Sequence, residues 1–147
     1  MVLRDIMSTN VVKAKPLDSI LSVAQKMKEA NVGCVPVVEN DELVGIITDR
    51  DITIRVTAAG LNPADQTVET FMNTRPVSAT PEMSVQDAID FMGEKGIRRL
   101  PVLEKGKLIG VVSIDDIAYA FDDKEAVGWA LSSIARAEGL RKVAKVA

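Results

Sequence analysis

Apolar residues follow a helical spacing of three, four and seven positions in two separate stretches of the chain. Such spacing places them on one face and predicts an amphipathic helix in each stretch. Ser19 and Ser84 stand directly before the two stretches, where N-cap residues belong, and Ser84 with Asp87 has the spacing of a capping box. The apolar positions are Ile20, Val23, Ala24 and Met27 in the first stretch and Val85, Ala88, Ile89 and Met92 in the second.

Dense apolar runs around each predicted helix indicate strands. We expect short opening strands at residues 11–14 and 77–79, and hairpins that pair 34–38 with 43–47 and 99–103 with 108–112. The polar segments 39–42 and 104–107 between them are typical of turns. Pro36 and Pro101 predict edge strands or strand starts, because proline cannot donate to a β-ladder. The second strand of each hairpin leads without a gap into a helix that begins at Thr48 or Ser113.

The two halves are copies of one unit displaced by 65 positions. Met7 recurs as Met72, and further pairs share this offset without an insertion. Self-similarity at a fixed period indicates supersecondary units that bury their apolar faces against each other. The further pairs are Pro16 and Pro81, Ser19 and Ser84, Pro36 and Pro101, Gly45 and Gly110, and Asp51 and Asp116.

The repeats set the predicted domain boundaries. The first copy is expected at residues 2–60, a linker at 61–67, the second copy at 68–121 and a C-terminal helical tail at 122–147. The tail carries an apolar helical stripe, and Gly139 is expected to interrupt it. Trp129 beside the stripe is either an interface anchor or an ordinary packing residue. The stripe consists of Val127, Ala130, Leu131 and Ile134.

Composition restricts the class of protein. The 147 residues carry a net charge of −3 and no histidine, which argues against nucleic-acid binding and removes the commonest general base and metal ligand. No apolar run is long enough for a membrane span, and the N-terminus lacks a signal-peptide pattern. Cys34 is the single cysteine, so the chain forms no internal disulfide and we expect a reducing compartment, the cytoplasm.

The strand-to-helix junctions carry the candidate chemistry. Each has a glycine in the strand, a hydroxyl at the junction and an aspartate three residues later, as Thr48 with Asp51 and as Ser113 with Asp116. An aspartate so placed can accept hydrogen bonds from paired sugar hydroxyls, and the glycine admits a flat ring or a neighbouring backbone. The same pattern also caps a helix and needs no ligand for that role. The sequence leaves both interpretations open.

Duplicated units with these proline, glycine and Thr/Ser-x-x-Asp positions resemble a tandem pair of CBS domains, often called a Bateman module. The resemblance covers residues 2–117, and the opening and the first junction are similar to stand-alone bacterial and archaeal members. It implies an α/β fold of two β-α-β-β-α repeats packed with pseudo-twofold symmetry, followed by the helical tail. It also implies adenosine-nucleotide binding in clefts between the repeats, and dimers.

Carried over to this chain, the resemblance implies two ligand sites. Asp116 and Asp51 are expected to hold ribose hydroxyls, while Ser113 and Thr48 touch ribose or phosphate. One site is expected to use Arg98, Arg99, Ser113 and Asp116 with Thr9, Asn10 and Gly33. The other is expected to use Thr48 and Asp51 with Thr74, Arg75 and Arg98.

The two expected sites differ in charge. The second repeat offers Arg98 and Arg99 where the first offers Gly33 and Cys34. Guanidinium groups make charge-assisted bonds to phosphates, so we expect the Asp116 site to bind more tightly. The alternative is that both arginines merely solvate a strand edge.

The favoured function is a non-catalytic sensor of AMP, ADP, ATP or another adenosyl compound, with no other cofactor and no metal. We expect a homodimer that acts on a separate regulated protein, away from membranes. The alternative is an interaction adaptor with vestigial clefts and a tail that mediates oligomerisation. An enzyme is disfavoured, because the sequence offers no nucleophile–base pair, metal-ligand cluster or Walker-type loop.

Overall fold

The computed structural model describes residues 1–146, with side chains described through residue 138. The chain forms two compact units. Unit 1 comprises Met1–Thr9, Ser78–Glu104 and Ile109–Ala147, and unit 2 comprises Asn10–Val77 and Lys105–Leu108. Each unit therefore combines the body of one repeat with the opening segment that precedes the other repeat in the sequence.

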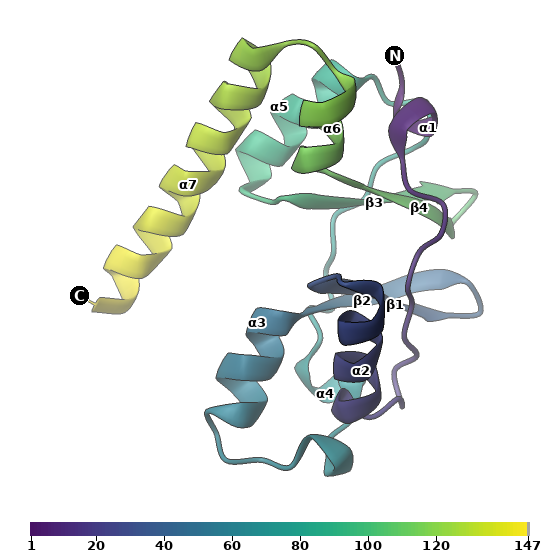
Figure 1. The fold of residues 1–147 in the computed structure, drawn as a ribbon, viewed down its shortest axis with the longest axis vertical. Coiled ribbons are helices and arrows are strands. Elements are labelled where there is room, and N and C mark those ends of the chain that lie inside the picture. The colour runs from purple at the N-terminus through teal and green to yellow at the C-terminus, as the bar shows by residue number, and fades with distance from the viewer. Residues whose placement is uncertain (147) are drawn as a thin grey trace. The chain divides into compact units, whose positions relative to one another are not determined.

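Unit 2 is a hairpin of β1 (Cys34–Glu39) and β2 (Glu42–Thr48) with helices on one face (Figure 1). The helices are α2 (Ile20–Ala30), the single turn α3 (Asp49–Asp51) that continues as the π-helix η1 (Ile52–Thr57), and α4 (Val68–Phe71). The 3₁₀ turn η2 (Pro63–Asp65) precedes α4. Apolar residues from all these layers form one buried cluster, including Ile20, Val23, Val35, Ile47, Val56 and Val68.

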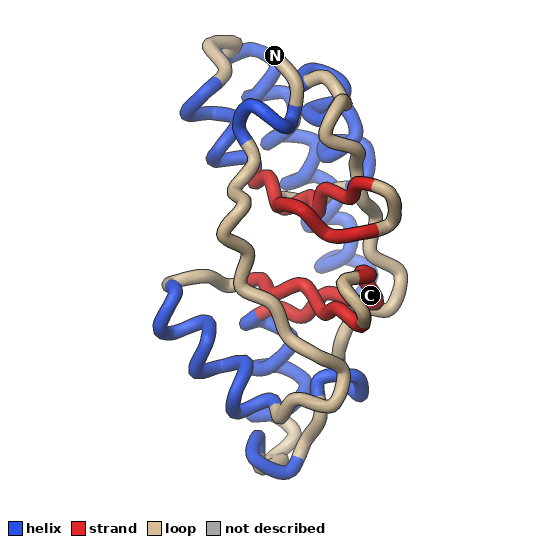
Figure 2. Tube along the Cα trace, turned by 90° about the vertical axis from the view of Figure 1, so that its right-hand side faces the viewer, coloured by secondary structure: helices blue, strands red, loops and turns tan. Residues whose placement is uncertain are grey.

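Unit 1 repeats this arrangement with β3 (Arg99–Glu104), β4 (Lys107–Ser113), α1 (Leu3–Ile6), α5 (Val85–Lys95) and α6 (Ile114–Ala120). Within each unit the strands form one layer and the helices another (Figure 2). Unit 1 also contains the long helix α7 (Lys124–Val146), which packs on α5 and α6. The fully buried side chains of unit 1 include Leu3, Ile89, Met92, Leu100, Ile117 and Ile134.

The predicted helix starts are confirmed. Ser19 Oγ accepts a hydrogen bond from Ser22 N (3.1 Å), and Ser84 Oγ accepts one from Asp87 N (3.0 Å). Such caps contribute about 1 kcal/mol each. Only the serine half of the predicted Ser84–Asp87 capping box forms. Asn31 (φ 54°) ends α2 in the left-handed conformation typical of a helix C-cap.

The hairpin turns are also confirmed. The two central residues of each turn have positive φ: Asn40 and Asp41 in the first, Lys105 and Gly106 in the second. Turns of this kind match the right-handed twist of paired strands.

The predicted opening strands are wrong in length, since each is a single parallel bridge, Ala14 to Val37 and Ala79 to Val102. Ala14 N donates to Pro36 O (3.0 Å), and Val38 N donates to Ala14 O (2.8 Å). To extend the parallel ladder, the next N–H would have to come from Pro36, which has none. The prolines that mark the repeat therefore also shorten its first strand.

The tail is one helix, and the predicted interruption at Gly139 is wrong, because α7 continues to Val146. Val127, Ala130 and Ile134 are buried as the stripe predicted, whereas Leu131 is 39% exposed. Residue 147 lies outside the described residues.

Candidate functional site

The end of β4 and the start of α6 form a closed pair of hydrogen bonds in unit 1. Ser113 Oγ accepts from Asp116 N (3.0 Å), and Asp116 Oδ2 accepts from Ser113 N (2.8 Å). Ser113 is buried and Asp116 is half-buried. The capping interpretation of this motif is thus confirmed as its structural role.

The junction of β2 and α3 in unit 2 has the same geometry. Thr48 Oγ1 accepts from Asp51 N (3.2 Å), and Asp51 Oδ2 accepts from Thr48 N (2.9 Å). The Thr48 hydroxyl also lies 3.0 Å from the same carboxylate oxygen, to which it can donate. The repeated sequence therefore places two equivalent hydroxyl–carboxylate pairs at two equivalent junctions.

Capping uses one oxygen of each aspartate. In both pairs the bonded atom is Oδ2, and Oδ1 makes no hydrogen bond to any residue in the described part of the chain. A carboxylate has about four acceptor positions, so one oxygen per aspartate remains able to accept hydrogen bonds from a ligand.

The opening segments reach these junctions by pairing with the closing strands. Ser8 N donates to Val111 O (2.9 Å) and Val111 N donates to Ser8 O (3.0 Å). Ser8, the residue before Thr9, is therefore paired with the strand residue two positions before Ser113. In unit 2, Asn73 pairs with Ile46 in the same way (2.8 and 3.0 Å).

Because the Asn73–Ile46 bridge is antiparallel, the chain after Asn73 runs away from Thr48. The grouping of Thr74 and Arg75 with Thr48 and Asp51 therefore stays a prediction. Thr74 and Arg75 are exposed, and Arg75 N donates to Asn73 Oδ1 (3.1 Å). Thr9 and Asn10 are exposed as well, but they fall in different units.

The strand glycines admit these opening segments. A Cβ at Gly45 would meet Met72 Sδ at 2.5 Å and Asn73 O at 3.0 Å. A Cβ at Gly110 would meet Met7 Sδ at 2.7 Å and Ser8 O at 3.1 Å. The sequence allowed either a flat ring or a neighbouring backbone against these glycines. In this structure a neighbouring backbone lies against both.

Arg98 and Arg99 lie beside the junction of unit 1. Ile114 N, the first N–H of α6, donates to Arg98 O (3.0 Å). The exposed Arg98 side chain pairs with Glu138 of α7, with Nε 3.5 Å from Oε1. Arg99 is half-buried, and its Nη1 lies 3.4 Å from Arg98 O. The Arg98 carbonyl thus contacts the start of α6, the Arg99 guanidinium lies against that carbonyl, and the Arg98 guanidinium is paired with a carboxylate of α7.

Gly33 occupies the equivalent place in unit 2, where Asp49 N donates to Gly33 O (2.9 Å). A Cβ at Gly33 would meet Asp49 Oδ2 at 2.8 Å, so the Asp49 carboxylate lies against the glycine. The structure therefore brings Gly33 together with Thr48 and Asp51 in one unit. The grouping of Gly33 and Asn10 with Asp116, and of Arg98 with Asp51, stays a prediction.

Sequence reasoning missed two acidic side chains at these junctions. Asp49 directly follows the junction residue Thr48. The sequence could have pointed to it, because the second repeat has the uncharged Ile114 at the equivalent position and the two junctions therefore differ in charge. Glu138 lies in the tail, which has no repeated counterpart, so nothing in the alignment of the repeats points to it.

The described residues contain no group of three or more His, Cys, Asp or Glu side chains that could hold a metal ion. Within the same part of the chain, no helix combines the length and hydropathy that a membrane crossing requires.

Comparison with known proteins agrees with the duplicated architecture. The family described as "CBS domain" matches residues 3–57 and again residues 68–123. The chain is 40% identical over 131 residues to the CBS domain-containing protein YhcV of Bacillus subtilis, covering 89% of this chain and 93% of that protein. It is 34% identical over 116 residues to hypoxic response protein 1 of Mycobacterium tuberculosis, covering 78% and 81%.

Solved structures show the same fold. A crystal structure of hypoxic response protein I with two coordinated zinc ions matches with a TM-score of 0.75 and 33% identity, covering 82% of this chain and 99% of that one. A hexameric CBS-CP12 protein from bloom-forming cyanobacteria matches with a TM-score of 0.74 and 29% identity, covering 83% and 68%.

Proposed function

The chain belongs to the CBS-domain family as a tandem pair, and we propose that it is a non-catalytic regulatory module that binds an adenosine nucleotide. The observation that carries the proposal is the pair of equivalent junctions in which one oxygen of Asp51 and of Asp116 is left for a ligand. AMP, ADP, ATP or another adenosyl compound is the proposed ligand, in clefts between the repeats.

Asp116 is the proposed ribose-binding residue of the tighter site. Its Oδ1 accepts from ribose hydroxyls, while Oδ2 stays in the cap with Ser113 N. Arg99 and Arg98 bind the phosphates, because guanidinium groups make charge-assisted and often bidentate bonds to phosphate oxygens. Thr9, Asn10 and Gly33 complete this proposed site.

Asp51 is its counterpart in the weaker site, together with Thr48, Thr74, Arg75 and Arg98. Asp49 supports this ranking, because it directly follows Thr48 and adds a negative charge at this junction where the second repeat has Ile114. An anionic phosphate chain is repelled by a nearby carboxylate, so the charge difference disfavours the Asp51 site further.

Regulation requires that the ligand prefer one arrangement of the protein over another. We propose that a homodimer is the responding unit, that a separate protein receives the signal, and that the protein works in the cytoplasm, without a membrane or nucleic acid. The hexameric state named for the cyanobacterial CBS-CP12 protein supports assembly as a property of related chains.

An interaction adaptor is the second candidate, and exposed apolar side chains on α6 and α7 favour it. Tyr119 is 96% exposed, Trp129 47% and Leu131 39%. In this alternative the clefts are vestigial and the tail mediates oligomerisation. A tail-mediated dimer that forms without any nucleotide would support it.

Calorimetric titration of the full chain with AMP, ADP, ATP and S-adenosylmethionine tests the sensor proposal. We expect at least one compound to bind more tightly than millimolar. Weaker binding by every compound overturns the sensor and leaves the adaptor. Incubation with ATP and magnesium tests the absence of catalysis, and turnover above that of protein-free buffer would contradict it.

A further inference from the structure

A pocket of about 660 Å³ lies in unit 2 at the turn of the β1–β2 hairpin. The proposed nucleotide junction is at the other end of β1, where Cys34 pairs with Thr48. Three acidic residues line the pocket: Glu39 and Asp41 from the turn and Glu69 from α4. The rest of the lining is one lysine, Lys15, the amide Asn40, and five apolar residues: Pro16, Leu17, Val38, Val44 and Met72.

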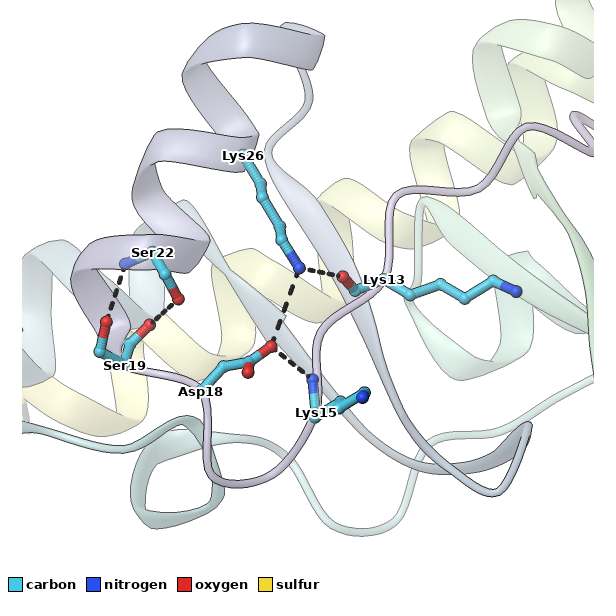
Figure 3. A network of polar contacts seen from close by, with 6 residues as sticks. All are labelled: Lys13, Lys15, Asp18, Ser19, Ser22 and Lys26. Atoms are coloured by element: carbon cyan, nitrogen blue, oxygen red, sulfur yellow. Dashed lines mark hydrogen bonds and ion pairs between the residues drawn. The ribbon is translucent and has the colours of Figure 1, made fainter.

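The segment that carries Pro16 and Leu17 is held in place by polar contacts (Figure 3). Asp18 Oδ2 accepts from Lys15 N (2.8 Å) and lies 3.8 Å from Lys26 Nζ. Lys26 Nζ in turn donates to Lys13 O (2.8 Å). This wall of the pocket is therefore fixed by its own hydrogen bonds.

Unit 1 has the same backbone frame at the equivalent place. Glu69 N donates to Pro16 O (2.9 Å) in unit 2, and Arg4 N donates to Pro81 O (3.0 Å) in unit 1. Each donor is the second residue of a four-residue helix, α4 or α1. The Arg4 and Glu69 side chains therefore leave equivalent backbone positions.

In unit 1 this frame binds a guanidinium group. Arg4 Nη2 donates to Glu104 Oε1 (2.5 Å) and to Glu82 Oε1 (3.0 Å). The hydrogen bond to Glu104, followed by the one to Glu82, raises the pKa of Arg4 above its ordinary value. Glu104 is the counterpart of Glu39 in the repeat, so a carboxylate at this position ligates a cation in unit 1.

Unit 2 keeps the carboxylate without the guanidinium. Glu69 replaces the arginine, and Asp41 adds a further negative charge where the second repeat has Gly106. Among the described residues, no basic side chain comes within 4.0 Å of the carboxylates of Glu39, Asp41 or Glu69. Lys15, the basic residue of the lining, donates its backbone N–H to Asp18 Oδ2 (2.8 Å), and its side chain forms no ion pair with any described carboxylate.

We propose that this pocket binds an organic cation whose guanidinium or ammonium group bonds to Glu39 and Glu69. Its alkyl part then lies against Leu17, Val44 and Met72. The apolar part of the lining favours such a cation over a metal ion, and the described residues include no metal-binding group. The proposal is independent of the nucleotide sites.

Titration of the full chain with n-butylguanidinium tests it, with n-butylurea as the neutral compound of similar shape. We expect the cation to bind at least tenfold more tightly than the urea, to shift the NMR signal of the Met72 methyl, and to weaken as salt rises. Equal affinity of the two compounds, or shifts confined to other residues, would overturn the proposal.

Glu69→Arg supplies the guanidinium that unit 1 already has. This variant should lose at least tenfold in affinity for n-butylguanidinium, whereas Glu29→Arg, the same charge change at an exposed position of α2, should keep wild-type affinity. Unchanged binding by Glu69→Arg contradicts the assignment of the site.

Arg4→Ala provides a positive control that does not depend on the Glu69 variant. Removal of its guanidinium should open the equivalent position in unit 1, so that n-butylguanidinium also shifts the Met7 methyl.

Agmatine and N-acetyl-arginine amide distinguish a free small-molecule cation from an arginine side chain of a protein. Preference for agmatine assigns a free small molecule, and equal binding assigns an arginine side chain of a protein; binding of neither contradicts the proposal.

Discussion

Arg98 Nε lies 3.5 Å from Oε1 of Glu138, across the space between the start of β3 and the helix α7. The pair joins an arginine of the repeated unit to a carboxylate of the tail. Both side chains are partly exposed, 46% and 38%, so the pair contributes little to stability, about 0–1 kcal/mol. Its position has more consequence, because a carboxylate on Arg98 competes with the phosphate that we propose Arg98 to bind.

Glu138→Gln should therefore raise the affinity of the tighter site for a phosphate-bearing nucleotide, by up to about fivefold, the equivalent of ~1 kcal/mol. Calorimetry with ADP measures the change, and adenosine, which has no phosphate, should show none. Glu125→Gln, at an exposed position in the first turn of the same helix, is the matched control and should bind as wild type does. An equal gain for adenosine would show that Glu138 acts by other means.

Asp116→Asn and Asp51→Asn should separate the two binding events. Asparagine keeps an oxygen that can cap the helix but loses the charge, so folding is largely retained while the bond to ribose hydroxyls weakens. We expect Asp116→Asn to lower the tighter affinity at least tenfold, since hydrogen bonds to charged groups are worth about 1.5–3 kcal/mol.

Asp51→Asn should affect only the weaker event. Calorimetry at two nucleotide concentrations resolves the two events, and thermal unfolding monitors the caps. Equal losses in both variants would mean that the sites are equivalent and that the charge ranking is wrong.

Asp49→Asn should strengthen the weaker site. Asp49 directly follows Thr48 at the Asp51 junction, and its neutralisation takes one negative charge from the neighbourhood of the proposed phosphate. Because the side chain is exposed, we expect an increase of about two- to fivefold that disappears at high salt. Asp115→Asn, at an exposed position in the first turn of α6, carries the same charge change in unit 1 and tests whether the effect is local. Identical gains from both variants would point to net charge instead.

Local features of this fold were predictable because short stretches of sequence determine them. Ser19 and Ser84 cap their helices, and Thr48 and Ser113 begin theirs, since a hydroxyl before an apolar helical stripe satisfies free N–H groups. The order of helices and strands followed from the spacing of apolar residues, and the repeated unit followed from identical residues 65 positions apart.

Contacts distant in the sequence were not predictable in the same way. The pairing of Arg98 with Glu138 depends on the path of α7, for which the repeat supplies no template. The length of the opening strands was missed because Pro36 and Pro101 were considered within their own hairpins, whereas their missing N–H groups limit the neighbouring segments. The π-helical turns of η1 have no signal in apolar spacing.

The single tryptophan packs across Gly93, and this contact distinguishes two glycines in unit 1. A Cβ at Gly93 would meet Trp129 Cζ3 at 2.5 Å, whereas a Cβ at Gly128 would meet nothing within 4 Å. Gly93→Ala should displace the ring, at a cost of about 1–3 kcal/mol for overpacking, less the gain in helix propensity.

Gly128→Ala should stabilise the protein by about 0.5–1 kcal/mol, because alanine loses less backbone entropy in a helix interior. Thermal unfolding should thus move in opposite directions for the two variants, by about 2–4 °C per kcal/mol for a chain of this size. Fluorescence of Trp129 should change for Gly93→Ala alone, since only that substitution moves the indole. If Gly93→Ala unfolds at or above the wild-type temperature with an unchanged emission spectrum, the ring does not depend on the glycine, and Trp129 is then available as the interface anchor that the adaptor alternative requires.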